Sequence, residues 1–416
     1  MSMRHWQREH QSLLLWFSLL IVVVFSAIVI VQGAAAPAPH PMDQGFLISA
    51  DLRLHRVDGH WVFQYPHLQW SGAISSTGVV GIYKLLINPS PEFLNWHIKL
   101  TVMFVWFFSI LYLIRSLIVD QVVGALVLLG IGALGLQFLE PTSELLGAIF
   151  FNVFLLLIFR QRFLLAGIAL ALFGLAKVDM SAASTLVLIY CTWRYQRSEY
   201  MPLLSAYVFT MVLLLAPALY LHGSDGALGG RALAVFQYHY DYFSGIQSTG
   251  IRTPFAEAFN SPSSFAQAVL SNPREYATFI GKSIIESARN LFFVGHIYVI
   301  GFLVMFLFAG RFWRERGTRQ NELNAAADIT FILFISTTLF SIVFAYLHVR
   351  YAIRFTDLSA IGFAAMLEQT LAQPKKYAGP LNPTDRGLTA LRITLGVLAL
   401  GGLLRLPEFV AAPHDW

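Results

Sequence analysis

Residues 13–31 read LLLWFSLLIVVVFSAIVIV and contain no charged side chain. An apolar run of this length can cross the hydrocarbon core of a bilayer as a single helix. Further apolar runs follow at residues 97–117, 121–138, 144–159, 163–178, 180–193, 202–221, 291–310, 328–347, 355–371 and 389–404. The sequence therefore predicts an all-α polytopic membrane protein, folded as one domain over residues 1–416, with about eleven transmembrane helices (about ten to twelve, since several runs are short).

The composition restricts the class of protein. Of the 416 residues, 56% are hydrophobic and only 12% are charged, whereas a soluble domain carries about twice that share of charge. The net charge of +5 does not indicate a nucleic-acid partner, because the basic residues form short clusters between apolar runs. Cys191 is the single cysteine, which excludes a disulfide within the chain. We therefore expect a lipid bilayer as partner and no nucleic acid.

The basic residues between the apolar runs predict the orientation. With the N-terminus in the cytoplasm, the inner connections hold Arg4, Arg8, Arg115, Arg160, Arg162, Arg194, Arg197, Arg311, Arg314, Arg316, Arg319, Lys375, Lys376 and Arg386. Lys and Arg near helix ends resist translocation, so this asymmetry favours that orientation. The first run is then an uncleaved signal anchor rather than a cleaved leader, and a bacterial inner (cytoplasmic) membrane is the predicted location.

Two long loops, residues 33–96 and 222–290, lie on the outer side in this orientation. After Asp43, apolar residues recur at helical spacing, namely Phe46, Ala50, Leu54 and Val57. This pattern predicts a helix lying in the membrane interface, with Asp43 as its N-cap. A second interfacial helix is predicted over residues 77–87. The later loop contains the aromatic sequence YHYDYF at residues 238–243, which suits the headgroup zone.

Several ionisable residues lie on the predicted outer face, although the membrane topology does not explain why they are there. They are Asp43, Asp51, Asp58, Glu140, Lys177, Asp179, Arg350 and Arg354. Arg350 and Arg354 depart from the positive-inside tendency within a short outer turn. This surface is therefore where we expect the chemistry.

Several stretches, in the order in which they occur, resemble a known family. They are Asp43-Gln44 followed by GFLISADLRLHRV and Asp58-Gly59-His60-Trp61, then GIYKLLINPSPEFLNWHIKL at 81–100, FLEP at 138–141, FLLAGIALALFGLAK at 163–177, and Arg350-Tyr351. This order is similar to that of the GT-C superfamily of integral-membrane glycosyltransferases, particularly the dolichyl-phosphate-mannose-protein mannosyltransferase-like group. The resemblance implies a transferase that moves a sugar from a polyprenyl-phosphate donor to a lipid, glycan or protein acceptor on the periplasmic face.

An inverting transfer of this kind needs a base for the acceptor proton, and cations or a divalent metal for the departing phosphate. We expect Asp43 to be the base. Asp51, about two helical turns later, and Glu140 are further catalytic candidates. The predicted substrate-binding residues are Arg350, Arg354, Lys177, His239 and Tyr240. The guanidinium of Arg350 suits phosphate because it offers several donors.

Structural roles compete with these functional ones. Asp43 could act only as an N-cap, and Glu140 only as a first-turn acid that favours the dipole of the following helix. Lys177 and Asp179 could pair with each other. Arg350 could reach lipid headgroups. No metal is specified, because the three histidines of the first outer loop, His55, His60 and His67, match no ligand spacing.

Other functions are also open. A polysaccharide polymerase or ligase that uses lipid-diphosphate glycans would share the many helices, but would place its large loop late in the chain. A transporter would bury ionisable residues within its helices, whereas most of these runs are apolar. A non-enzymatic membrane scaffold would need no intact site.

Overall fold

The computed structural model describes residues 13–24, 27–28, 53–57, 60–64, 91–135, 143–224, 230–244, 254–293, 318–345, 349–372 and 383–404. For some of these residues, including Arg350 and Arg354, it describes the backbone alone. Asp43, Asp51 and Glu140, and the predicted interfacial helix at 77–87, lie outside the described residues.

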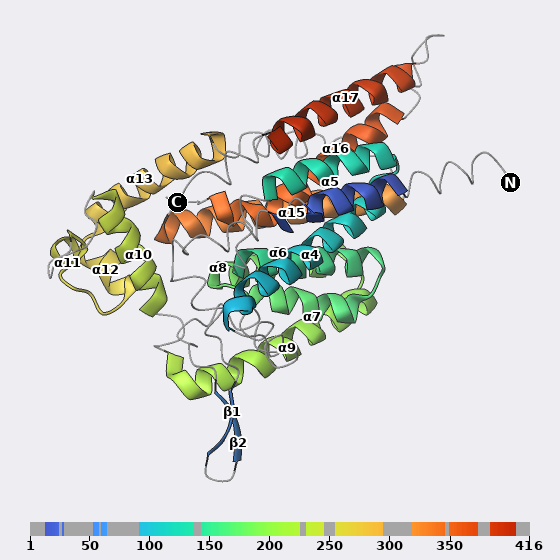
Figure 1. Cartoon of the computed structure of the whole chain (residues 1–416). Helices are drawn as coiled ribbons and strands as arrows, with labels where there is room; N and C mark the ends of the chain where they lie inside the picture. The colour runs from blue at the N-terminus through green and yellow to red at the C-terminus, as the bar shows by residue number, and fades with distance from the viewer. Residues whose placement is uncertain are drawn as a thin grey trace.

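The described chain is predominantly helical (Figure 1). Its main bundle contains the helix Leu13–Val24 and α4 (Pro91–Leu117), α5 (Gln121–Gly135), α6 (Ser143–Phe159), α7 (Phe163–Gly174), α8 (Val178–Arg194), α9 (Arg197–Ser224), α15 (Thr318–Phe344), α16 (Val349–Ala372) and α17 (Pro383–Leu404). Every predicted apolar run overlaps one of these helices, except the run at 291–310, which lies almost wholly outside the described residues.

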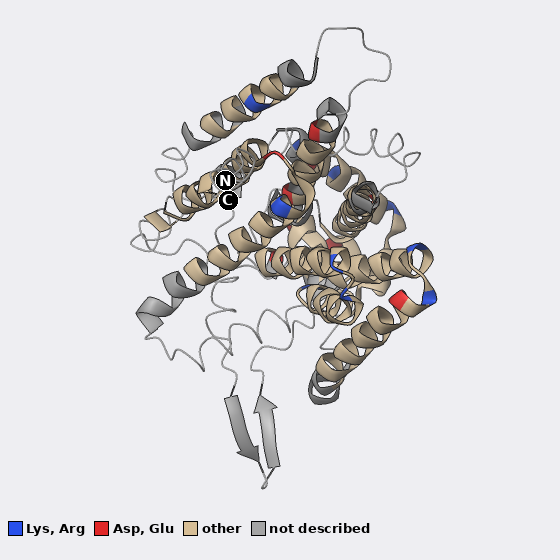
Figure 2. Cartoon of the chain, turned by 90° about the vertical axis from the view of Figure 1, so that its right-hand side faces the viewer, with Lys and Arg blue, Asp and Glu red and all other residues tan. Residues whose placement is uncertain are grey.

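The helices contain the apolar stretches that a membrane protein requires. Among the described residues, three stretches are long and apolar enough to cross a bilayer, Leu100–Leu117, Arg197–Ala216 and Leu323–Phe344. Shorter apolar helices accompany them. Figure 2 shows most of the bundle in tan, with Lys, Arg, Asp and Glu in short isolated segments. The protein is thus a helical membrane protein, and the number of eleven crossings stays a prediction.

One part of the first long loop differs from the prediction. Arg53–Val57 (β1) and His60–Gln64 (β2) form an antiparallel hairpin with Leu54 opposite Phe63, where an interfacial helix was expected to run through Val57. That part of the helix prediction is wrong. HWVFQ is rich in β-branched and aromatic residues, and the sequence between the strands is Asp58-Gly59, a dipeptide that favours two-residue hairpin connections.

Short connections fix the directions of the helices in the bundle. Two tight turns, at 160–162 and 175–177, join α6, α7 and α8, so these helices alternate in direction. The Tyr190 hydroxyl, late in α8, donates to Asp328, early in α15, at 2.6 Å. Because α16 begins five residues after α15 ends and packs against it, α16 runs back in the direction of α8. Helices α6, α8 and α16 therefore begin at one end of the bundle, which we call the α6/α16 end.

A smaller group of helices packs against α15 at the α6/α16 end. It consists of α10 (Gly230–Phe243), α11 (Pro254–Phe259), α12 (Phe265–Ser271) and α13 (Pro273–Phe293), and we call it the aromatic module. Its fully buried centre is Phe236, which is surrounded by five phenylalanine and tyrosine rings at 4.8–5.6 Å between ring centres. Tyr276 donates to the backbone carbonyl of Val343 at 3.1 Å, which attaches the module to the last turn of α15. Figure 1 shows the module gathered at that end of α15.

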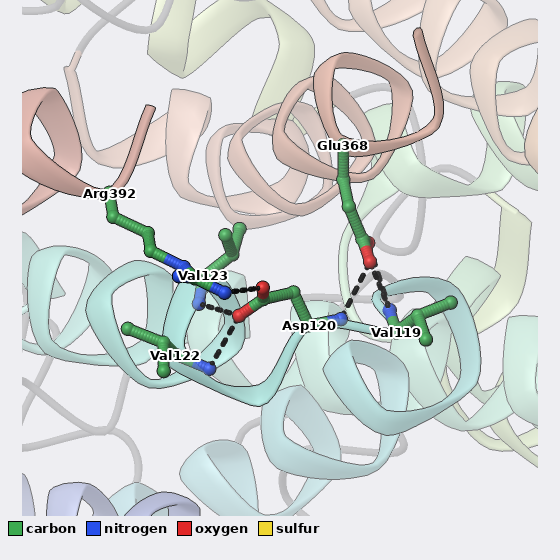
Figure 3. A network of polar contacts seen from close by, with 6 residues as sticks. All are labelled: Val119, Asp120, Val122, Val123, Glu368 and Arg392. Carbon is green, nitrogen blue, oxygen red and sulfur yellow. Dashed lines mark hydrogen bonds and ion pairs between the residues drawn. The ribbon is translucent and has the colours of Figure 1, made fainter. Parts of the chain in front are cut away.

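The opposite end of the bundle is joined by polar contacts between helices that are far apart in the sequence (Figure 3). The buried carboxylate of Glu368, late in α16, accepts backbone N–H groups from Val119 and Asp120 in the α4–α5 turn at 2.6–3.1 Å. Asp120 accepts from Val122 and Val123 at the start of α5, and Arg392 of α17 forms an ion pair with it. These contacts hold α4, α5, α16 and α17 together at the end that lies away from the aromatic module.

Candidate functional site

The α6/α16 end contains a buried ion pair. Glu144 lies in the first turn of α6, and Lys177 is the residue that precedes α8. The Lys177 ammonium pairs with the Glu144 carboxylate, and their side chains are only 13% and 5% exposed. From the sequence, Asp179 was a possible partner of Lys177, and Glu144 was not among the candidate residues. Asp179 is buried in the first turn of α8, so two carboxylates and one ammonium lie where α6 and α8 begin.

A second polar cluster lies inside the bundle, centred on Asp357 of α16, which is 2% exposed. Its Oδ2 atom accepts from Trp106 Nε1 of α4 at 3.3 Å and from Asn152 Nδ2 of α6 at 3.2 Å. Asn152 also donates to Ser109 Oγ at 3.0 Å. A carboxylate in a bundle interior is costly unless such donors surround it, and it commonly marks a functional position. This cluster therefore fixes the contact of α16 with α4 and α6.

The Asn152–Asp357 contact also shows that the first turns of α6 and α16 lie at nearly the same height along the bundle. Glu144 precedes Asn152 by eight residues, which is about 12 Å along a helix axis. Arg350 precedes Asp357 by seven residues, which is about 10 Å. Because the two helices pack together and run in the same direction, the backbone of Arg350 lies at nearly the same height as the Glu144–Lys177 pair.

Arg350 and Arg354 also share one stripe of α16 with its buried residues. The positions are 350, 354, 357, 361, 364 and 368, separated by alternating steps of four and three residues. Such residues follow one face of a helix. The four later members of the stripe are Asp357, Ile361, Ala364 and Glu368, and each is at most 5% exposed. The backbone therefore places positions 350 and 354 on the same stripe of α16 as these buried residues.

The two remaining predicted binding residues, His239 and Tyr240, lie on α10 in the aromatic module. The Tyr240 hydroxyl donates to Glu275 at 2.8 Å, and the ring packs against Phe236 and Phe259. Burial, and then the hydrogen bond to Glu275, raise the pKa of Tyr240 above the usual tyrosine range. Tyr240 thus has a structural role in the module, whereas His239 is partly exposed.

The arrangement provides positive charge beside buried carboxylates at one end of the bundle. Lys177, Arg350 and Arg354 come from two segments that lie more than 170 residues apart in the sequence, and the fold brings their backbones to the same end. Such a group of cations suits an anionic ligand such as a phosphate. Within the described ranges, no three His, Cys, Asp or Glu side chains are grouped as metal ligands.

Sequence reasoning missed Glu144, Asn152 and Asp357. Each lies inside a predicted apolar run and was treated as part of it. The available signal was the presence of an acid or amide within such a run, which in a membrane protein indicates a functional position.

Comparison with known proteins adds no family to this description. No protein-family model matches the chain, and no curated protein matches it.

Proposed function

We propose that the protein is a membrane glycosyltransferase that moves a sugar from a polyprenyl-phosphate donor to a lipid, glycan or protein acceptor. In this proposal it lies in a bacterial inner membrane with its N-terminus in the cytoplasm, and the α6/α16 end faces the periplasm. The resemblance of the chain to GT-C enzymes suggests the reaction. The observation that carries the proposal is the position of Arg350 and Arg354 on the bundle-facing stripe of α16, level with the Lys177–Glu144 pair.

These cations have the chemistry that the donor requires. The donor ends in a phosphate, and its departure from the sugar concentrates negative charge on the phosphate oxygens. Guanidinium groups donate to two phosphate oxygens at once, and an ammonium adds a compact charge. Arg350 and Arg354 belong to a helix that Asp357 anchors, so the backbone positions of both residues are set before substrate arrives, which favours charge stabilisation.

In the proposed reaction, a carboxylate removes the proton from an acceptor hydroxyl as its oxygen attacks the anomeric carbon of the sugar. The bond between that carbon and the phosphate oxygen breaks, and polyprenyl phosphate leaves with the electron pair. Asp43 is the proposed base, with Asp51 and Glu140 as the other candidate carboxylates. Arg350, Arg354 and Lys177 receive the phosphate, and His239 lies in the module beside this end. If a divalent metal takes part, it would help to neutralise the same phosphate.

A transfer assay tests the proposal. Purified protein in lipid nanodiscs is given radiolabelled polyprenyl-phosphate sugars and extracted membrane acceptors, and the labelled product is separated from donor. We expect transfer by the wild-type protein, loss of transfer in Asp43→Asn, and normal transfer in the matched control Asp58→Asn. Equal transfer by wild type and Asp43→Asn would exclude Asp43 as the base.

A transporter is the second candidate, because the structure buries Asp357 among α4, α6 and α16. Sequence analysis disfavoured transport because helix interiors were expected to be apolar, and this carboxylate departs from that expectation. Proteoliposomes containing the protein would then take up a labelled polyprenyl-phosphate sugar or a free sugar without forming a covalent product. Asp357→Asn would abolish the uptake. Uptake without transfer would replace the glycosyltransferase proposal.

A further inference from the structure

Helix α13 of the aromatic module has one face that is fixed to the bundle. Tyr276 bonds the carbonyl of Val343, and the Ser283 hydroxyl bonds the carbonyl of Ala345. Ser283 and Ser287 are buried on this side, and Phe279 closes the aromatic cluster. The contacts fix both the position of α13 and its rotation about its own axis.

Part of the exposed side of α13 is an uncovered apolar face. Ile284 is 49% exposed and Ile285 is 69% exposed. Ala277 and Gly281 are exposed beside them, and a Cβ atom added at Gly281 would meet no other atom within 4 Å. In a water-facing helix this face would normally be polar, so the exposed isoleucines favour an apolar environment.

Basic residues lie along one side of this apolar face. Arg274, Lys282 and Arg289 are all exposed. Arg289 forms only a 3.6 Å pair with Glu286, and its side chain stays 68% exposed, so the pair does little to neutralise it. An apolar face bordered by Lys and Arg is typical of helices that lie in the plane of a membrane surface.

The position of α13 agrees with this pattern. One of its bonds reaches Val343, in the last turn of the candidate membrane span Leu323–Phe344, and the other reaches Ala345, the residue after that span. The end of a membrane span lies at the boundary between hydrocarbon and headgroups. Helix α13 is therefore held at that boundary, beside the α6/α16 end (Figure 1).

We propose that α13 lies in the headgroup zone of the leaflet at the α6/α16 end and binds anionic phospholipids. Ile284 and Ile285 enter the upper part of the acyl chains, and Arg274, Lys282 and Arg289 contact lipid phosphates. The contact holds the aromatic module against the bilayer. This proposal concerns a lipid surface and does not depend on the transferase activity.

Site-specific labelling tests the placement directly. Cys191 is fully buried and is replaced by Ala, after which single cysteines are introduced as Ile285→Cys and, as a matched control on α11, Glu257→Cys. Each is labelled with an environment-sensitive fluorophore in nanodiscs that hold one copy of the protein. We expect the label at position 285 to show blue-shifted emission and strong quenching by lipids with a doxyl group near the headgroup. The label at position 257 should show neither effect.

Charge variants test the choice of lipid. Two sets of phosphatidylcholine nanodiscs are prepared. In one set the doxyl-labelled lipid is phosphatidylcholine, and in the other it is phosphatidylglycerol. Quenching of the label at position 285 is compared between the two sets. We expect stronger quenching by the anionic lipid, and loss of this preference in Lys282→Glu/Arg289→Glu, since each basic residue near an anionic surface favours it by up to about fivefold. Equal emission at positions 285 and 257 would overturn the proposal. Blue shift without lipid quenching, found only with two copies per disc, would instead show a second copy of the chain on this face.

Discussion

Asp357 is the residue on which the packing of α16 most depends. Replacing it with Ala leaves the buried N–H groups of Trp106 and Asn152 without their acceptor. A buried donor that loses its partner costs about 1–3 kcal/mol, so Asp357→Ala should lower the free energy of unfolding by about 2–5 kcal/mol. Thermal unfolding in nanodiscs measures the effect.

Asp357→Asn is the matched control, because asparagine keeps the shape of the side chain and one accepting oxygen. This substitution should lower the free energy of unfolding by about 1 kcal/mol. If both substitutions have equal effects, the negative charge of Asp357 matters more than its hydrogen bonds. If neither has an effect, the cluster does not anchor α16.

The Lys177–Glu144 pair allows stability to be separated from function. Lys177→Met leaves a buried carboxylate without its ammonium, and breaking a buried pair in this way costs about 3–5 kcal/mol. Replacing both residues, as Lys177→Met/Glu144→Leu, should restore most of the stability, because an apolar pair of similar volume fills the same space.

The double variant should nevertheless bind polyprenyl phosphate about tenfold more weakly than the wild type, since a hydrogen bond to a charged group is worth about 1.5 kcal/mol or more. Microscale thermophoresis with polyprenyl phosphate measures this. Wild-type affinity in the stable double variant would assign Lys177 a purely structural role.

At the scale of single elements, the aromatic module should respond to alkaline pH through Tyr240. Burial and the bond to Glu275 raise the pKa of Tyr240, so the folded module favours the neutral phenol. A raised folded-state pKa contributes stability that is complete below about pH 10 and is lost as the pH rises through the folded-state value. The melting temperature of the wild type should therefore fall above about pH 10.

Tyr240→Phe lacks this ionisable group and should lose less stability between neutral and alkaline pH than the wild type does. Tyr242, which is 54% exposed, is the control, and Tyr242→Phe should follow the wild type. Parallel pH curves for the wild type and Tyr240→Phe would show that the phenol of Tyr240 does not contribute to the alkaline transition.

Elements were predictable wherever apolar content alone determines them. The apolar runs that overlap α4 to α9 and α15 to α17 favour a helix in lipid, because a helix satisfies its own backbone hydrogen bonds. The hairpin was not predicted, because Phe46 to Val57 also fits a helical period. The β-branched and aromatic residues of HWVFQ and the Asp58-Gly59 dipeptide were the competing signals.

Contacts between distant elements could not be predicted in the same way. Glu144 and Lys177 are 33 residues apart, and Trp106 and Asp357 are 251 residues apart. Neither helical period nor composition relates such positions. The topology of the apolar runs therefore predicted that Lys177, Arg350 and Arg354 lie on one surface. It did not predict the ion pair between Lys177 and Glu144.

At the scale of the whole molecule, the two ends of the bundle differ in their chemistry. The α6/α16 end gathers Lys177, Arg350 and Arg354, whereas the opposite end uses its charges to join helices through Glu368 and Asp120 (Figure 3). The charges of the opposite end thus join helices, and the binding proposed for the α6/α16 end does not rest on them.

At the opposite end, substitutions of Glu368 and Arg392 should lower the free energy of unfolding by unequal amounts. Glu368 is buried and accepts backbone N–H groups from the two residues just before α5. The dipole of α5 also favours an acid at this position. Glu368→Ala should therefore lower the free energy of unfolding by about 2–4 kcal/mol. Arg392 is 40% exposed, and Arg392→Ala should cost at most about 1 kcal/mol. Neither substitution should change binding of polyprenyl phosphate. Unfolding midpoints and the binding assay together check this, and a larger cost for Arg392 would reverse the assignment.

The most direct test of the account is a cryo-electron microscopy structure of the protein in nanodiscs with bound polyprenyl phosphate. We predict that the phosphate lies at the α6/α16 end, within hydrogen-bonding distance of the Arg350 guanidinium and close to Asp43. A phosphate at the opposite end, beside Arg392, would contradict the assignment of the site and with it the proposed function.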